Sequence, residues 1–548
     1  MPISASRRRT LAVLAAITIA GGLLRVYQIN RNGFWLDEAF SVWMAAHPVP
    51  ALFAWLIRID QHPPLYYTFL HFWLQAGDNA GYVRMLSALF STLAIPVLFL
   101  IATRIAGLRA GFIAAVILAL SPFQVRFAQE ARMYALLMLN ASLATLALTY
   151  LLTDQRAATV PIGSQLVGSV RAYRRSSRSH PLRLRDVATD LAWLAYMFFT
   201  AATVLTHNTA IFYPLAANLF VLGFIVYRKR CPRHDRSDGG VMGGAAEASV
   251  QDASVRAFSP PPLRNWLWAQ AGAFLFWCPW ALPAVVQSVG VYNQFWIPFP
   301  TIDTVINAVG ALLNDFTPQF LGRLGIVWLG MVTLLVLGGL YLRRRLSVLF
   351  FLLVLLLTPI FGELLVSLRR PIFYDRTLIW TAIPLYLLLA FGLLRLRFKV
   401  LIYGGLVLLC AVNLLSLQNY YQNFTKEQWR EAAASVASQV RDGDLILFNA
   451  TWVQIPFDYY FRHFDHSVTE HGVPVDLFDR GVLEPKMAGS DLPRMQSLVR
   501  DQQRVWLVYS HDWYTDPQRI IPAALEDEFD LVAAETFTGL QILLYERR

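Results

Sequence analysis

Two adjacent carboxylates, Asp37 and Glu38, stand among aromatic residues in the segment GFWLDEAFS. The segment follows the first long apolar run of the chain, at 10–29, so the pair is expected close to a membrane surface. Carboxylates held there can bind a divalent cation or take a proton from a substrate hydroxyl group. The alternative is an acidic first turn on a surface helix, where the helix dipole favours Asp and Glu.

Three further motifs carry side chains that could act beside the pair. DQHPPLYY contains His62, QEARMY contains Glu130 and Arg132, and RRPIFYDR ends at Arg376. Guanidinium groups suit phosphate, so the arginines indicate an anionic ligand, although they could instead pair with nearby acids or lipid headgroups. His207, in THNT, is more often a hydrogen-bonded histidine at the end of a membrane span than a metal ligand.

The composition requires most of the chain to lie in a membrane. Hydrophobic residues make up 56% of the 548 residues and charged residues 15%, against roughly 25% charged in soluble domains. A span needs about 20 apolar residues. Eleven runs meet or approach this length, at 10–29, 84–104, 110–124, 133–152, 187–205, 209–227, 265–287, 324–342, 346–366, 377–394 and 399–417. We therefore expect a mainly α, polytopic membrane protein whose first run is a retained signal anchor.

The distribution of positive charge predicts the orientation. Loops 153–186 and 228–264 carry seven basic residues each, and they share the cytoplasmic side with the N-terminus only if the run 63–76 does not cross. We therefore predict that 63–76 is an interfacial helix with Tyr66, Tyr67 and Trp73 at headgroup level. The two basic loops are expected to contact anionic lipid. The C-terminus then lies outside.

The composition changes to that of a soluble protein near residue 418. Residues 1–417 are predicted to form the membrane domain, with an acidic first outer loop at 30–83, and residues 418–548 a small extracytoplasmic α/β domain. From Lys426 onward the chain has 12 basic and 20 acidic residues, so the net charge of +11 arises in the membrane domain. That charge is explained by topology, and we infer no nucleic-acid binding.

Inside the soluble domain, residues 427–440 have helical periodicity. Buried strands are predicted at 444–449 and 505–509, and a hairpin is predicted around Thr538-Gly539. No glycine-rich phosphate loop follows the first strand, so a role in docking or acceptor recognition is favoured over a second active site.

The motifs FWLDEAFS, DQHPPLYY and QEARMY, in this order within about the first 150 residues, resemble the GT-C glycosyltransferases. The resemblance is to the bacterial branch that contains protein O-mannosyltransferases, aminoarabinose transferases and Rgt-like lipopolysaccharide glycosyltransferases. It implies a sugar donor linked to a polyprenyl phosphate and used at the outer face of the bacterial plasma membrane. The expected acceptor is a hydroxyl group of a glycan, a lipid or a protein.

The resemblance also implies roles for single residues. Asp37 is expected to be the catalytic base, with Glu38 and Glu130 as its acidic neighbours. The residues expected around the donor phosphate are His62, Arg132, Tyr134 and Arg376. His62 stands where relatives can carry Lys, which leaves its role open between phosphate contact and metal ligand. A divalent ion (Mg, Mn or Zn) could take part, with Asp37 and His207 as candidate ligands.

The chemistry of such a transfer fits these residues independently. A polyprenyl phosphate is already a good leaving group, so the reaction needs a base for the acceptor hydroxyl and positive charge for the departing phosphate. Direct displacement by one base would invert the anomeric carbon. The alternative function is a secondary transporter or lipid flippase, which tends to show repeated halves and polar residues near mid-membrane. Here the charges cluster at one face, which favours the enzyme.

Overall fold

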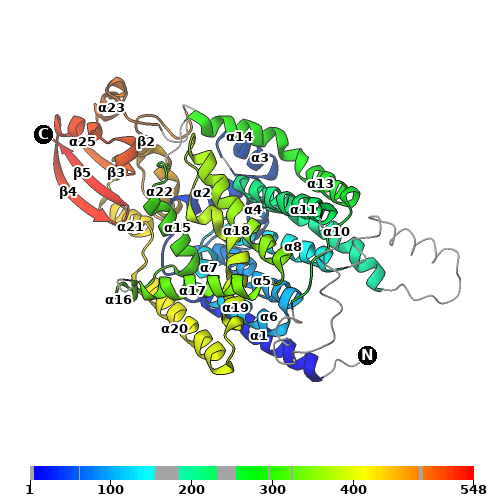
Figure 1. The fold of residues 1–548 in the computed structure, drawn as a ribbon. Coiled ribbons are helices and arrows are strands. Elements are labelled where there is room, and N and C mark those ends of the chain that lie inside the picture. The colour runs from blue at the N-terminus through cyan, green and yellow to red at the C-terminus, as the bar shows by residue number, and fades with distance from the viewer. Residues whose placement is uncertain are drawn as a thin grey trace, which may run out of the picture.

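The computed structural model describes residues 5–60, 62–154, 184–230, 255–293, 297–322, 325–479 and 485–548. Within them a large helical body is followed along the chain by a small mixed α/β domain at one end of the molecule (Figure 1). The predicted fold class, a mainly α membrane protein with a small α/β domain, is confirmed. The predicted cytoplasmic loops 153–186 and 228–264 lie for the most part outside the described residues.

The helical body is built from long helices joined by short ones. Its first half contains α1 (Ala5–Val26), α2 (Leu36–Ala46), α3 (Val49–Arg58), α4 (Leu65–Leu74), α5 (Ala80–Ala106), α6 (Leu108–Leu120), α7 (Pro122–Ala128), α8 (Tyr134–Thr153), α10 (Leu184–Val204), η1 (Asn208–Ile211) and α11 (Phe212–Arg230). Its second half contains α13 (Leu263–Trp277), η2 (Cys278–Trp280), α14 (Ala281–Asn293), α15 (Ile302–Asn314), α16 (Gln319–Gly322), α17 (Ile326–Tyr341), α18 (Leu346–Ser367), η3 (Asp375–Thr381), α19 (Ala382–Arg395) and α20 (Lys399–Asn423).

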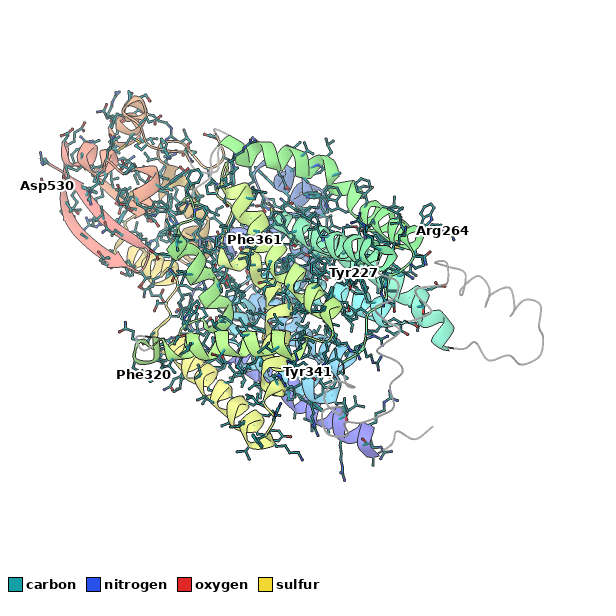
Figure 2. All side chains as sticks on the ribbon, in the orientation of Figure 1. Tyr227, Arg264, Phe320, Tyr341, Phe361 and Asp530 are labelled. Carbon is teal, nitrogen blue, oxygen red and sulfur yellow. The ribbon has the colours of Figure 1, made fainter. Side chains whose placement is uncertain are left out.

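Eight helical segments among the described residues are long and apolar enough to cross a membrane, and the bent pair of α6 and α7 would make a ninth. The predicted runs 187–205 and 324–342 coincide with the shorter apolar helices Ala188–Val204 and Ile326–Tyr341. Each of the eleven predicted runs therefore has a helix. Large apolar side chains stay exposed on these helices, as at Phe361 of α18, which is 62% exposed (Figure 2). Such a surface suits lipid rather than water.

The predicted run 110–124 is divided between α6 and α7. The two helices meet at an angle of 57°. Pro122 has no backbone N–H to continue the hydrogen-bond ladder of α6, and the Ser121 hydroxyl instead accepts a hydrogen bond from the Gln124 amide, which starts α7. The chain therefore turns here, and the loop after α7 carries Glu130 and Arg132 to the candidate site.

Helix α4 is the segment predicted to be interfacial. With ten residues it is too short to span a bilayer, as expected. Tyr66 and Tyr67 do not face the outside of the protein, however, because both are 0% exposed. The Tyr66 hydroxyl bonds to Ser87 of α5, 3.0 Å away. The two rings are thus held inside the protein, where their hydroxyl groups find polar partners.

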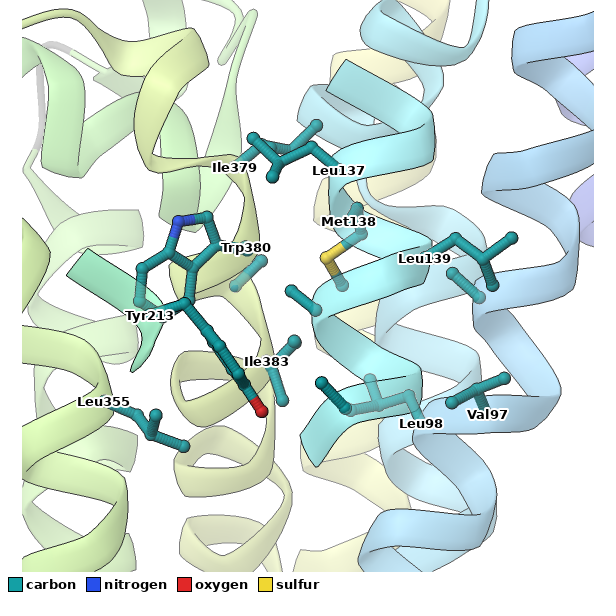
Figure 3. Packing of buried hydrophobic residues seen from close by; sticks show 14 of the residues in the cluster. Val97, Leu98, Leu137, Met138, Leu139, Tyr213, Leu355, Ile379, Trp380 and Ile383 are labelled. Atoms are coloured by element: carbon teal, nitrogen blue, oxygen red, sulfur yellow. The ribbon is translucent and has the colours of Figure 1, made fainter. Parts of the chain in front are cut away.

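The core between the long helices is filled by apolar side chains that come from distant parts of the chain (Figure 3). Tyr213 of α11 and Trp380 of η3 meet edge to face, with ring centroids 5.4 Å apart and planes at 75°. Both rings are buried. This contact anchors η3, the short segment that begins at Asp375 and carries Arg376.

Helices α17 and α19 approach each other closely at two glycines. A Cβ atom on Gly338 would lie 2.2 Å from the Leu388 carbonyl oxygen, and one on Gly392 would lie 2.0 Å from the Leu334 carbonyl oxygen. No side chain fits at such distances, so the backbones touch only because both residues are glycine.

The soluble domain contains a five-stranded sheet of order β2-β1-β3-β5-β4. The strands are β1 (Leu445–Asn449), β2 (Thr469–Gly472), β3 (Arg504–Ser510), β4 (Phe529–Phe537) and β5 (Leu540–Arg547). Its helices are α21 (Trp429–Gln439), η4 (Thr451–Val453), α22 (Gln454–Phe461), η5 (Gly489–Asp491), α23 (Leu492–Val499), α24 (Asp512–Thr515) and α25 (Ile520–Glu526). Strands β2, β1 and β3 are parallel, while β5 is antiparallel to both of its neighbours.

The predicted strands and the hairpin at Thr538-Gly539 are found, with Gly539 at φ +85° in the turn. Strand β2 was not predicted, because it has only four residues and lacks the run of β-branched and aromatic residues that marks a strand. Helix α20 continues to Asn423, so the helical body ends six residues beyond the predicted boundary at 417.

The close crossing of α17 and α19 makes a test of the fold. Gly338→Leu should lower the midpoint of thermal unfolding in detergent by several degrees, since overpacking a close contact typically costs about 1–3 kcal/mol. Gly330→Ala in the same helix is the control, because a Cβ atom there meets nothing within 4 Å. Equal midpoints for the two variants would contradict this packing.

Candidate active site

Helix α2 places the acidic pair, and groups from both domains fix its first turn. The Leu36 amide donates to Oε2 of Glu427, 2.9 Å away, and the Phe34 amide donates to the Tyr460 hydroxyl, 2.6 Å away. Glu427 and Tyr460 lie beyond the last long helix of the body. The start of α2 is therefore held by the segment that leads into the soluble domain and by the domain itself.

Glu38 is completely buried and fully bonded. Arg84 of α5 donates to both carboxylate oxygens, at 2.7 and 2.5 Å, and Lys426 donates to Oε2 at 3.1 Å. The Ala131 amide donates to Oε1 at 2.8 Å. Burial by itself would raise the pKa of Glu38, but the charges of Arg84 and Lys426 outweigh it and lower the pKa to about 2. This geometry suits a side chain that holds its surroundings in place.

Asp37 has a different environment, with 28% of its side chain exposed. Its Oδ2 lies 3.1 Å from Nη1 of Arg376 and 3.8 Å from Nη2 of Arg132. Burial opposes ionisation, but the charges of Arg132, Arg376 and His62 lower the pKa of Asp37 below its ordinary value. The pair is therefore no acidic turn on a solvated helix: one member is buried in salt bridges, and the other is an ionised, reachable carboxylate.

Arg132 connects Asp37 to the DQHPPLYY motif. Its Nη1 donates to the Ser41 hydroxyl at 3.1 Å and to the Tyr67 hydroxyl at 3.4 Å. Its Nη2 lies 3.5 Å from Nε2 of His62. The other ring nitrogen of His62 lies 2.8 Å from Oδ1 of Asp60. Arg132 thus bridges the first and second acidic loops.

His207 lies next to this group, with its ring centroid 5.4 Å from that of His62. Its Nδ1 accepts a hydrogen bond from the Thr209 amide at 3.2 Å. Burial, and then the nearby charges of His62, Arg132 and Arg376, lower the pKa of His207 well below its ordinary value. His207 is therefore a neutral, hydrogen-bonded histidine.

The loop after α7 brings a third carboxylate, Glu130, to the site. Its Oε1 lies 3.9 Å from Nε of Arg126, and no described residue donates a hydrogen bond to its Oε2, although that atom is buried. Burial raises the pKa of Glu130 despite the opposing charges of Lys426 and Arg126. Arg126 is mainly satisfied elsewhere, by Asp315 at 3.2 Å and Asp375 at 3.4 Å.

A cavity of about 170 Å³ opens between the helical body and the entrance to the soluble domain. Its charged lining residues are Arg126, Glu130, Arg376, Lys426 and Glu427. Its aromatic lining residues are Trp35, Phe127, Tyr374 and Phe424. Arg376, which lines the cavity, also contacts Asp37, so one guanidinium group connects the cavity to that partly exposed carboxylate. The predicted residue Tyr134 lies here too, with its ring 5.7 Å from the guanidinium carbon of Arg376.

The comparisons with known proteins agree on the architecture. A family model described as dolichyl-phosphate-mannose-protein mannosyltransferase matches residues 61–168. The structure of ArnT from Cupriavidus metallidurans in the apo state matches 99% of this chain and 98% of its own, at 12% identity and a TM-score of 0.57. The chain has a GT-C fold. No curated protein matches the chain significantly in sequence.

Two further solved structures extend the same finding. ArnT from Cupriavidus metallidurans bound to undecaprenyl phosphate matches 97% of both chains, at 13% identity and a TM-score of 0.54. The archaeal oligosaccharyltransferase AglB from Archaeoglobus fulgidus, in complex with an inhibitory peptide and a dolichol-phosphate, matches 98% of this chain and 74% of its own, at 12% identity and a TM-score of 0.51. The similarity includes the soluble domain, since almost the whole chain is covered.

The expected metal ligands do not form a cation site. In the part of the chain that the structure describes, no three His, Cys, Asp or Glu side chains gather around one point. Asp37 instead faces two guanidinium groups, and Nδ1 of His207 accepts from Thr209. This donor set does not fit a divalent ion, so we derive no step through one.

Four residues that hold the candidate site together were not predicted as site residues: Arg84, Lys426, Glu427 and Tyr460. Arg84 was counted as the start of an apolar run, although a charged residue at a span end is a signal in itself. Lys426 and Glu427 carry no such signal, because they begin a segment of ordinary soluble composition.

The burial of Glu38 predicts its effect on stability. Glu38→Gln leaves Arg84 without its charge partner, and breaking a buried pair typically costs about 3–5 kcal/mol. The folded-state pKa of about 2 is below the ordinary 4.5, so the stabilisation is present above pH 4.5 and is lost as the pH falls toward 2. The measurement is thermal unfolding in detergent from pH 7 to pH 3. The loss of stability at low pH should be smaller in Glu38→Gln than in the wild type. Asp37→Asn is the matched control and should unfold close to the wild type; equal destabilisation by both variants would refute the assignment.

Proposed function

We propose that the protein is a membrane glycosyltransferase that moves a sugar from a polyprenyl-phosphate donor to a hydroxyl acceptor at the outer face of the membrane. The observation that carries this proposal is the ionised, reachable Asp37, held 3.8 Å from Arg132 and 3.1 Å from Arg376, which also lines a cavity. One carboxylate base and two guanidinium groups are what displacement of a phosphate by a hydroxyl group requires.

In this mechanism the acceptor oxygen attacks the anomeric carbon while its proton passes to Asp37. The bond between that carbon and the phosphate oxygen breaks on the opposite face, and its electron pair leaves with the phosphate. Attack and departure on opposite faces invert the anomeric carbon. Arg376 and Arg132 stabilise the charge that develops on the phosphate.

Arg376 links the two halves of the reaction. Without donor, its guanidinium neutralises Asp37, which lowers the basicity of that carboxylate. A donor phosphate competes for the same guanidinium. As Arg376 turns toward the phosphate, Asp37 loses a positive neighbour and becomes a stronger base. Donor binding would therefore activate the base that deprotonates the acceptor.

The remaining predicted residues have supporting roles in this proposal. Arg132, His62 and Tyr134 surround the donor phosphate, with Arg132 bonded to the DQHPPLYY loop. Glu38 positions α2 through Arg84 and Lys426 and does not touch substrate.

A polyprenyl phosphate is supported as the lipid by the solved relatives, since ArnT was solved with undecaprenyl phosphate and AglB with a dolichol-phosphate. We further propose the plasma membrane of a bacterium as the location, with the N-terminus cytoplasmic and the soluble domain outside. The acceptor is a hydroxyl group of a glycan, lipid or protein. The transporter alternative is disfavoured, because the charged groups converge on one end of the helices.

The base is tested by Asp37→Asn, which keeps the shape of the side chain and removes its basicity. Turnover should fall by about 10²–10⁴-fold, the usual contribution of a general base. The measurement is transfer of label from a radiolabelled polyprenyl-phosphate sugar in membranes that contain the full-length protein. Folding should persist, as the stability comparison with Glu38→Gln checks. Turnover within about threefold of the wild type would remove Asp37 from the reaction.

The phosphate contact is tested by Arg376→Ala. The apparent KM for the lipid donor should rise about tenfold or more, while the KM for the acceptor changes little, because a charge-assisted hydrogen bond to phosphate is lost. Arg369→Ala is a matched control, since that nearby arginine is exposed. An unchanged donor KM in Arg376→Ala, or an equal rise in both variants, would contradict the role.

A further inference from the structure

We propose that the cavity lined by Arg376 is a sugar-binding subsite in which Glu130 and Lys426 bind hydroxyl groups, and that it accepts a neutral sugar in preference to an amino sugar. This inference rests on the proposed transferase function and names the class of sugar. It follows from the unsatisfied polar atoms of the cavity, from its walls and from its charge.

Glu130 supplies the hydrogen-bond acceptor. Its side chain is only 4% exposed, it lines the cavity, and its buried Oε2 receives no hydrogen bond from the described residues. A buried carboxylate oxygen without a donor is costly, because it has lost its hydrogen bonds to water without replacement. A ligand hydroxyl group in the cavity would remove that cost.

Lys426 supplies the hydrogen-bond donor. Its ammonium group has three N–H bonds, of which two are directed to Oε2 of Glu38 and to the Gln129 carbonyl oxygen, each at 3.1 Å. Lys426 lines the same cavity as Glu130, so the third N–H is available to a ligand oxygen there. An acceptor and a donor on one cavity suit hydroxyl groups, which both donate and accept.

The walls and the size of the cavity also suit a single sugar. The aromatic rings of Trp35, Phe127, Tyr374 and Phe424 line it. Such rings can cover the C–H faces of a sugar while the polar groups bind its hydroxyls. The volume of about 170 Å³ is below the roughly 300–1,000 Å³ of pockets for drug-sized ligands. The cavity therefore has room for one sugar unit and little else.

The charge of the cavity selects against an ammonium group. Three cations, Arg126, Arg376 and Lys426, line it against two carboxylates, Glu130 and Glu427. The Oε2 atom of Glu427 already accepts from the Leu36 amide and from the indole nitrogen of Trp429, and its Oε1 lies 3.8 Å from Nε2 of His511. Burial raises the pKa of Glu130, which further weakens its attraction for a cation. At Glu130, the ammonium group of an amino sugar would compete with Lys426, Arg126 and Arg376, whose charges already act on that carboxylate.

The experiment measures binding and needs no turnover. The full-length protein in detergent is titrated calorimetrically at pH 7 with farnesyl phosphate, farnesyl phosphoryl glucose and farnesyl phosphoryl glucosamine. Wild type should bind the glucose lipid about tenfold more tightly than the glucosamine lipid. Glu130→Gln should remove about tenfold of the affinity for the glucose lipid and leave the affinity for bare farnesyl phosphate unchanged.

Glu431→Gln is the matched control, because it alters a surface carboxylate that pairs with Arg430, 2.7 Å away, and does not line the cavity. It should leave the ratio of the affinities for glucose lipid and bare lipid as in wild type. The inference is overturned if the glucosamine lipid binds as tightly as the glucose lipid, or if Glu130→Gln leaves that ratio unchanged. Binding of bare farnesyl phosphate separates this failure from that of the proposed function: if none of the three lipids binds, the transferase proposal itself falls.

Discussion

The buried ion pair between Glu38 and Arg84 is the interaction on which the site depends. Arg84 uses all five of its N–H groups, two on Glu38 and three on the carbonyl oxygens of Ile29, Asn32 and Gly33. The guanidinium therefore shapes the chain that leads into α2. Glu38 in turn accepts hydrogen bonds from the Ala131 amide, in the second acidic loop, and from Lys426, in the segment that leads into the soluble domain. Burial of either charge alone would be unfavourable. As an ion pair, the two side chains join three parts of the protein.

This arrangement explains why two adjacent carboxylates differ in character. Successive residues of a helix point about 100° apart, so only one of them can face the ion pair. Glu38 points inward and is 0% exposed, while Asp37 points toward Arg376 and Arg132 and has 28% of its side chain exposed. Because Glu38 fixes the rotation of α2, it also fixes where Asp37 stands. A reactive group whose position is set by its buried neighbour needs little ordering of its own when substrate arrives.

Sequence patterns predicted the helices and strands, since apolar runs and alternation are local properties of the chain. They also predicted Asp37 and Arg376 as site residues, from the acidic pair that follows the first span and from the suitability of arginine in a short loop for phosphate. They could not predict that these two meet, since 339 residues separate them. The same reason hid Lys426, which lies 388 residues from Glu38. The burial of the α4 tyrosines was not predicted, because a short aromatic helix has the same composition whether it faces lipid or protein.

The net charge around Asp37 changes in the course of the proposed reaction. Without donor, one carboxylate lies against two guanidinium groups, so the local excess is positive and attracts phosphate. In the proposed reaction, a bound sugar phosphodiester would add one negative charge and bring this group close to neutral. Transfer would convert it into a phosphate monoester with more negative charge and leave a proton on Asp37. The guanidinium groups would then bind the product phosphate more strongly than the donor. Loss of the proton from Asp37 would restore the attraction between its carboxylate and Arg376. This would favour release of the lipid phosphate. On this argument the same two arginines that assist departure would slow release, and Asp37 acts in both steps.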